Sequence, residues 1–216
     1  VRGPMSSLSS SELVSLIRSV FPALAGDKSL AIFVDIPPNK KVDTPSWVQR
    51  REIALEWSQL LQDQLAELNL ESVDLIAYEM VQSNNADLPE KAYFIQDELP
   101  QLASDLSKSG IEINFSEVFE TTDLILAPTQ QSATAPLKVA AKQYQFRAAT
   151  MPGFSASMIP ALKIDYNAVN DRVNMLKSKL DTAESVTVKF LVDDSQEYEM
   201  FFDLRNRPAH ASGGRF

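Results

Sequence analysis

The residue best placed to do chemistry is Asp35, near the carboxyl end of an apolar run that spans Ser29–Ile36. Ligands of doubly wound α/β proteins bind at the carboxyl ends of the strands. A carboxylate there could accept a phosphoryl group, but such a site needs further acidic residues for Mg²⁺, and the preceding loop offers only Asp27. We therefore interpret Asp35 as a structural carboxylate that either caps a loop or pairs with Lys40.

The loop after this run argues against a dinucleotide site. Residues 36–40 read Ile-Pro-Pro-Asn-Lys and contain no glycine. A pyrophosphate-binding turn needs glycines so that backbone amides can approach the ligand at the start of a helix. Pro37 and Pro38 instead remove two of the amide donors that such a loop supplies. We expect no NAD or FAD site here.

No other group of residues predicts a metal or catalytic centre. The adjacent pair Asp193–Asp194 lies where a β-turn is expected, and turns favour aspartate for conformational reasons. His210 is the single histidine, so it cannot build a His-based zinc site alone and is expected at the surface. No Gly-x-Ser-x-Gly motif is present, and a serine triad would have to use His210. We expect no catalytic, cofactor-binding or metal-binding residue in this chain.

Composition narrows the possible partners. The formal net charge is −9, and the densest basic spots are the pairs Lys40–Lys41 and Arg50–Arg51, so a nucleic-acid partner is not expected. No apolar run approaches the ~20 residues that span a bilayer, so no membrane contact is expected either. The chain has no cysteine, which excludes disulfides and thiolate metal sites and favours a cytoplasmic location.

Apolar strands alternate with amphipathic helices over the first 160 residues. Strands are expected at Ser29–Ile36, Ser72–Val81, Thr122–Pro128 and Gln145–Thr150, and helices at Ser9–Phe21, Ser46–Leu68, Glu98–Ser109 and Pro136–Gln143. This alternation predicts an α/β fold with a parallel, Rossmann-like sheet and helices on both faces. Residues 82–97 and 111–121 have mixed periodicity and stay unassigned. In the longest helix, Trp57 falls on the apolar stripe and is expected in the core, and Asn69 is expected to end it in the left-handed conformation.

The pattern changes after Pro160. Asp165 is expected to cap a helix with one apolar stripe. Two alternating runs follow, Ser185–Val192 and Glu197–Leu204, separated by Asp193-Asp194-Ser195. That arrangement predicts an antiparallel β-hairpin with one face buried and one exposed. The sequence thus divides into an α/β domain (1–160), a helix plus hairpin (161–204) and a linker tail (205–216).

The second half of the chain resembles one enzyme family. From Thr122 onward it carries in order TTDLILAP (with Thr121), RAATMPGFSASMI, IDYNAVNDRVNMLKSKLDTAESVTVKF and FFDLRNRPAHASGG. The order and spacing of these segments resemble the amino-terminal part of the thermophilic-type metallo-aminopeptidases. The more specific elements are Arg147 to Gly153, Asp165–Tyr166 at the start of a helix, and Arg207–Pro208 after the hairpin.

The resemblance implies that the chain is a non-catalytic scaffold domain. Members of the family remove amino-terminal residues from peptides with two divalent metal ions such as zinc or cobalt. Their ligands belong to a carboxyl-terminal domain, in which the first lies in a segment similar to Asn-Leu-Pro-x-Gly-Glu, and no such segment occurs here. The resemblance also implies that the chain is a shortened piece of a longer protein, inactive alone, whose partners are its own catalytic domain, a peptide substrate and a second subunit.

Two alternatives stay open. Related sequences open the ring of dihydroxypyridines with an iron centre, so the parent could be a dioxygenase. The chain could also be a self-sufficient Rossmann-like module for binding or oligomerisation, because a fold does not determine a function.

Overall fold

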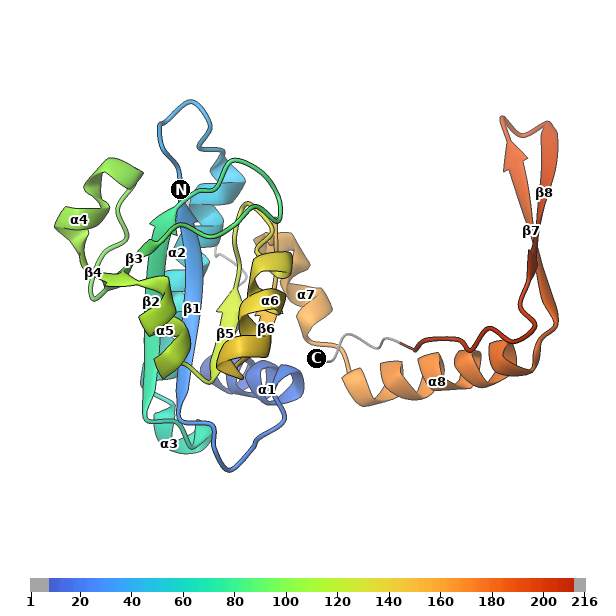
Figure 1. Ribbon diagram of the computed structural model, residues 1–216, viewed down its shortest axis with the longest axis horizontal. Coiled ribbons are helices and arrows are strands. Elements are labelled where there is room, and N and C mark those ends of the chain that lie inside the picture. The colour runs from blue at the N-terminus through green and yellow to red at the C-terminus, as the bar shows by residue number, and fades with distance from the viewer. Residues whose placement is uncertain (1–7, 212–216) are drawn as a thin grey trace. The chain divides into compact units, whose positions relative to one another are not determined.

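A computed structural model of the protein describes residues 8–211, which divide into two compact units, one ending at Ile164 and the other beginning at Asp165 (Figure 1). The first unit is a sheet covered by helices. Its strands are β1 (Ser29–Ile36), β2 (Ser72–Glu79), β3 (Lys91–Ile95), β4 (Gly110–Asn114), β5 (Leu124–Ala127) and β6 (Arg147–Thr150). Its helical elements are α1 (Ser10–Val20), α2 (Pro45–Gln62), α3 (Leu65–Leu68), η1 (Ala103–Asp105), α4 (Leu106–Ser109), α5 (Phe115–Thr121), α6 (Thr134–Tyr144), η2 (Ala156–Met158) and α7 (Ile159–Leu162).

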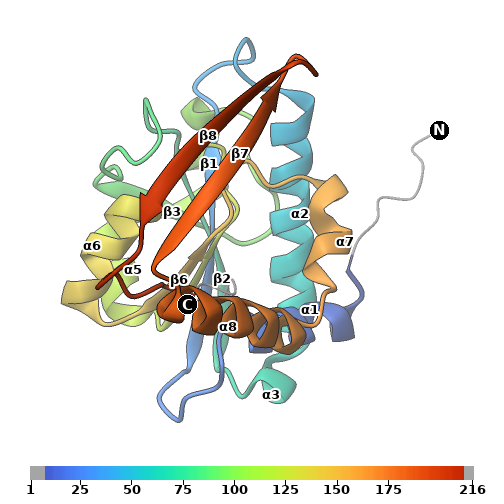
Figure 2. The ribbon, with the colours of Figure 1, turned by 90° about the vertical axis from the view of Figure 1, so that its right-hand side faces the viewer.

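The sheet has the strand order β4-β3-β2-β1-β5-β6. Strands β2, β1, β5 and β6 are paired in parallel, whereas β3 is antiparallel to both of its neighbours. Helices α1 and α2 lie on one side of the sheet and α5 and α6 on the other (Figure 2). The expected α/β fold with helices on both faces is confirmed, with the correction that the sheet is mixed.

Helix ends follow the local sequence. Ser9 and Glu12 form a capping box at the start of α1, and Thr44 accepts a hydrogen bond from the backbone N–H of Trp47 at the start of α2. The long helix expected to reach Leu68 ends earlier, at Gln62, because the chain turns there and α3 brings Leu68 into the core. Asn69 then adopts the expected left-handed conformation, with φ of 51°.

The expected crossover helix at Glu98–Ser109 is the clearest error in the sequence-based assignment. Only η1 and α4 are helical, because Pro100 disfavours helical geometry in the residue before it. Gly110 does not end a crossover helix but opens β4, which forms an antiparallel pair with β3. The stretches left unassigned therefore contain β3, most of β4 and α5.

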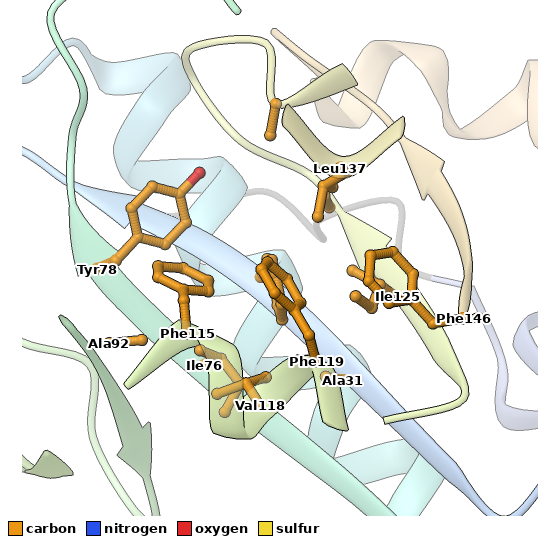
Figure 3. Packing of buried hydrophobic residues seen from close by; sticks show 13 residues of the cluster. Ala31, Ile76, Tyr78, Ala92, Phe115, Val118, Phe119, Ile125, Leu137 and Phe146 are labelled. Atoms are coloured by element: carbon orange, nitrogen blue, oxygen red, sulfur yellow. The ribbon is translucent and has the colours of Figure 1, made fainter. Parts of the chain in front are cut away.

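Each face of the sheet has its own core. On one face an aromatic cluster brings together Tyr78, Phe115, Phe119 and Phe146 (Figure 3). The ring of Phe115 lies 5.5 Å from Phe33 and 5.3 Å from Tyr78, and the ring of Phe119 stacks on Phe146 at 5.2 Å. Because side chains alternate along β1, its other face presents Leu30, Ile32, Val34 and Ile36, all fully buried. Trp57 of α2 is fully buried, as expected.

The second unit contains α8 (Tyr166–Thr182) and a hairpin of β7 (Ser185–Val192) and β8 (Gln196–Asp203). Asp165 caps α8 by accepting hydrogen bonds from the backbone N–H groups of Asn167 and Ala168, as expected. The hairpin is also confirmed. Asp193 and Asp194 have φ of 50° and 53°. Paired left-handed residues are the turn geometry that matches the twist of the strands.

The expectation that one hairpin face is buried is wrong for this unit taken by itself. None of the residues from 165 to 211 whose burial the structure describes is buried. Phe190, Tyr198 and Phe202 remain 44%, 54% and 44% exposed. The alternation of residue types is as predicted, but nothing within the unit covers the apolar side. None of the helices in residues 8–211 combines the length and the apolar character needed to cross a membrane.

Replacing Gly110 with alanine tests the β3–β4 pairing. A Cβ atom at Gly110 would lie 2.8 Å from the carbonyl oxygen of Phe94 and 2.9 Å from Cδ1 of Ile95, so the strands would have to separate. We expect the substitution to lower the free energy of unfolding by about 1–3 kcal/mol. Gly26→Ala is the matched control, since no atom lies within 4 Å of its added Cβ. Urea denaturation of both variants gives the comparison, and equal stabilities would contradict the pairing.

Candidate functional site

The carboxyl edge of the sheet is where the topology places a ligand. The chain leaves β1 for β2 on one side of it and later returns to β5 on its other side. The carboxyl ends of β1 and β5 therefore form the topological switch point, the usual ligand crevice of open α/β sheets. Asp35 lies there at the end of β1, next to the loop that follows β5.

The Asp35 carboxylate binds the backbone of this loop. It is 1% exposed, and its two oxygens accept hydrogen bonds from the backbone N–H groups of Gln130 and Gln131, at 2.7 and 2.9 Å. Of the two structural roles considered for Asp35, loop capping is confirmed and the ion pair with Lys40 is not formed. Burial raises the pKa of Asp35, while the two amides and the Arg50 cation oppose that increase.

Arg50 from α2 provides the positive charge beside Asp35. It is 2% exposed. Its Nη1 donates to the side-chain oxygen of Gln130 at 2.6 Å, and its Nε donates to the carbonyl oxygen of Phe154 at 2.5 Å. Burial lowers the pKa of Arg50, and the Asp35 charge opposes this effect. Gln130 therefore bonds to both Asp35 and Arg50. The Arg50 guanidinium also links α2 to the segments that follow β5 and β6.

Two aromatic residues complete the surroundings of Asp35. The indole N–H of Trp47, 1% exposed, donates to the backbone carbonyl of Asp35 at 3.0 Å. Tyr78 lies opposite Asp35 in the β1–β2 register and is fully buried. Its hydroxyl makes no hydrogen bond of normal geometry, although Thr129 lies close enough to influence it. Burial, reinforced by the Asp35 charge, raises the pKa of Tyr78 and keeps the phenol neutral.

The amino-terminus of α6, at the same edge, is also occupied by the protein's own side chains. The side-chain oxygen of Asn85 accepts a hydrogen bond from the backbone N–H of Ala135, and that of Asn84 accepts one from Ser132. The Ser132 hydroxyl accepts a third, from the backbone N–H of Thr134. Pro136, the third residue of the helix, has no N–H to donate. Amides that elsewhere bind a phosphate are therefore already bonded within the chain.

Of the other residues considered from the sequence, three belong to the second unit and Trp57 is a core residue of the first. Asp193 and Asp194 form the hairpin turn, and His210 is exposed, as expected. Trp57 packs on Phe154, with ring centroids 5.5 Å apart. Within residues 8–211 no group of three or more His, Asp or Glu side chains is placed to hold a metal ion. Sequence reasoning found Asp35 but missed Arg50, which it considered only as one of a basic pair.

The residues that carry the family resemblance have structural roles. Arg147 pairs with Asp27 at 2.6 Å and donates to the carbonyl oxygen of Pro22 at 2.9 Å, which ties β6 to the loop before β1. Gly153 adopts φ of 67°, and its N–H donates to the carbonyl oxygen of Thr129. A glycine tolerates this conformation at little cost. Comparison of the chain with family models, with curated proteins and with solved structures finds no match.

A double-mutant cycle measures the coupling between Asp35 and Arg50. Arg50→Met leaves a buried carboxylate without its cation, so we expect it to lower the free energy of unfolding by about 3–5 kcal/mol. Adding Asp35→Asn should then cost less than it does in the parent protein, with a coupling of at least about 1 kcal/mol. Lys91→Met, which breaks an exposed ion pair with Glu112, is the control and should change stability little. Strict additivity of the two buried substitutions would show that the groups do not interact.

Asp35 also predicts a dependence of stability on pH. Because the folded pKa is raised above the ordinary value of 3.8, the folded state holds this proton more tightly than the unfolded state does. The resulting stabilisation is present below that value and is lost as pH rises through the raised folded pKa. We expect the wild type to lose stability relative to Asp35→Asn over this interval. Urea titrations of both proteins at successive pH values measure it, and parallel curves would contradict it.

Proposed function

We propose that this chain is the non-catalytic amino-terminal scaffold of a metal-dependent aminopeptidase-like hydrolase, whose other domain binds the metals and removes amino-terminal residues from peptides. The observation that supports it most directly is that backbone amides at the carboxyl edge of the sheet already bond to the protein's own side chains. Asp35, Asn84 and Asn85 bond to the amides that a ligand would otherwise engage, so the edge serves to hold loops together.

The sequence resemblance supports the same proposal. Much of the resemblance comes from three residues with structural roles. Arg147 pairs with Asp27 and so anchors β6, Gly153 forms a tight turn, and Asp165 caps the start of α8. Residues with such roles are those that a scaffold must retain in order to present a neighbouring domain. The choice between a peptidase and a ring-cleaving dioxygenase belongs to that other domain, and the peptidase is proposed on the resemblance alone.

A second candidate is a stand-alone oligomerisation module, and a specific observation favours it. The hairpin presents an apolar face that residues 165–211 leave uncovered. Exposed contiguous apolar patches of this kind mark interaction surfaces. A module that binds a small ligand has less support. The backbone amides at the carboxyl edge of the sheet, where such a ligand is usually bound, already donate to Asp35, Asn84 and Asn85.

The scaffold proposal predicts how the isolated chain behaves with metal and substrate. We expect no stoichiometric uptake of Zn²⁺ or Co²⁺ in calorimetric titration and no hydrolysis of a leucyl anilide with either metal present. We expect hydrolysis to appear when the protein encoded by the complete reading frame is assayed under the same conditions. Chelator-treated protein is the control for both measurements. Tight stoichiometric metal together with hydrolysis by the chain alone would overturn the scaffold role.

A further inference from the structure

The sheet leaves a notch beside the amino-terminal half of β2. Strand β3 pairs with β2 only from Leu75 to Ala77, so no strand of the described chain lies beside residues 72–74 on that side. A cavity of about 450 Å³ lies there, within the roughly 300–1,000 Å³ of small-ligand sites. The notch is at the amino end of β2, away from the carboxyl edge of the sheet. Its apolar walls include Leu75, Phe94, Ile95 and Ile111, and its charged residues are Asp74 and Asp97.

The strand register places an aromatic ring next to a carboxylate in this notch. Asp74 precedes Ile76 by two residues, so both side chains point to the same face of the sheet. Phe94 lies opposite Ile76 in β3, and Ile111 lies opposite Phe94 in β4. Phe94 is therefore the diagonal neighbour of Asp74, a position from which an aromatic side chain can reach it.

Asp74 is poorly compensated for its burial. It is half-buried, and its carboxylate accepts a hydrogen bond from the Ser72 hydroxyl at 3.1 Å. By contrast, Asp27 and Asp43 each pair with an arginine, and Asp35 accepts two backbone N–H groups. Burial raises the pKa of Asp74, and the Ser72 hydrogen bond opposes the increase, whereas no cation within residues 8–211 does so.

Such a residue costs stability unless a further group compensates it. Because its folded pKa is raised, ionisation of Asp74 at neutral pH favours the unfolded state. Aspartate is also disfavoured within strands. Groups whose surroundings oppose their charge are concentrated at functional sites. A cation from outside the chain supplies what Asp74 lacks.

We propose that the notch binds an alkylguanidinium group, such as the side chain of arginine. The guanidinium donates to the Asp74 carboxylate and lies against the Phe94 ring, while the alkyl chain contacts the apolar walls. A guanidinium is planar and weakly hydrated, so it suits a ring and a carboxylate better than a compact ammonium does. Asp97 is exposed and adds a second negative charge, and the net charge of −9 attracts cations to the chain.

An NMR titration of the ¹⁵N-labelled chain tests the proposal. The probes are free L-arginine and Nα-acetyl-L-arginine methylamide, which represents arginine within a peptide. We expect binding to shift the amide signals of residues 74, 94–97 and 111, and the probe that binds more tightly identifies the source of the ligand. The matching citrulline compounds have nearly the same shape without the charge, so they should bind at least about tenfold more weakly.

Substitutions in the notch show which groups hold the probe. Asp74→Asn should weaken binding by at least about tenfold, because it removes a charge-assisted hydrogen bond. The same substitution should raise the urea midpoint at neutral pH, so its loss of binding cannot reflect loss of folding. Phe94→Leu keeps the wall apolar but removes the ring, and should weaken binding severalfold. Glu79→Gln, which changes an exposed carboxylate at the other end of β2, is the matched control and should bind like the wild type.

Three results would each overturn the proposal. Neither probe shifts these signals, the citrulline compounds bind as tightly as the arginine compounds, or Asp74→Asn binds like the wild type. The titration needs no metal and no hydrolysis, so its outcome is independent of the scaffold role.

Discussion

The structure of the first unit depends on a buried carboxylate bonded to two backbone amides. Strands β1 and β5 are neighbours in the sheet although far apart along the chain, and the Asp35 carboxylate joins the end of one to the loop after the other. At the opposite end of the same pair, Asp123 accepts hydrogen bonds from the backbone N–H groups of Lys28 and Ser29. The central strand pair is therefore held at both ends by carboxylates. Its register is set by polar bonds as well as by apolar packing.

A carboxylate can occupy this buried position only because its neighbours compensate for lost water. The two amides point at its oxygens, and Arg50 supplies a positive charge that is itself bonded to Gln130 and Phe154. Removing a charge from water costs several kcal/mol, so such a group is tolerated only with its bonds satisfied. The same bonds use the two backbone amides that lie nearest to Asp35 at the switch point.

The two units of the chain contrast in how they bury apolar surface. The first has a core on each face of its sheet, with aromatic rings on one side and aliphatic side chains against α2 on the other. The second has a well-capped helix and a hairpin with a favourable turn, yet its apolar face has no cover within residues 165–211. Local signals alone thus specify its elements.

The sequence by itself determined the elements whose signals are local. The continuous apolar run of β1, the Thr44–Pro45 start of α2, the left-handed Asn69, the Asp165 cap and the hairpin turn were all predictable. Each depends on the conformational preference or hydrogen-bonding capacity of a few adjacent residues. The short strands β3 and β4 were not predictable, because their half-exposed residues show no clear period and they are defined by pairing with each other.

Only the tertiary structure decided which groups bond to the Asp35 carboxylate at the carboxyl edge. Asp35 was recognisable as a candidate, and a structural role for it was the preferred interpretation, but its partners come from loops and helices far away in sequence. Neither the amides of Gln130 and Gln131 nor the burial of Arg50 has a local signature. Whether a buried carboxylate is a reactive group or a structural one depends on which donors surround it. Those donors are brought together only when the sheet forms.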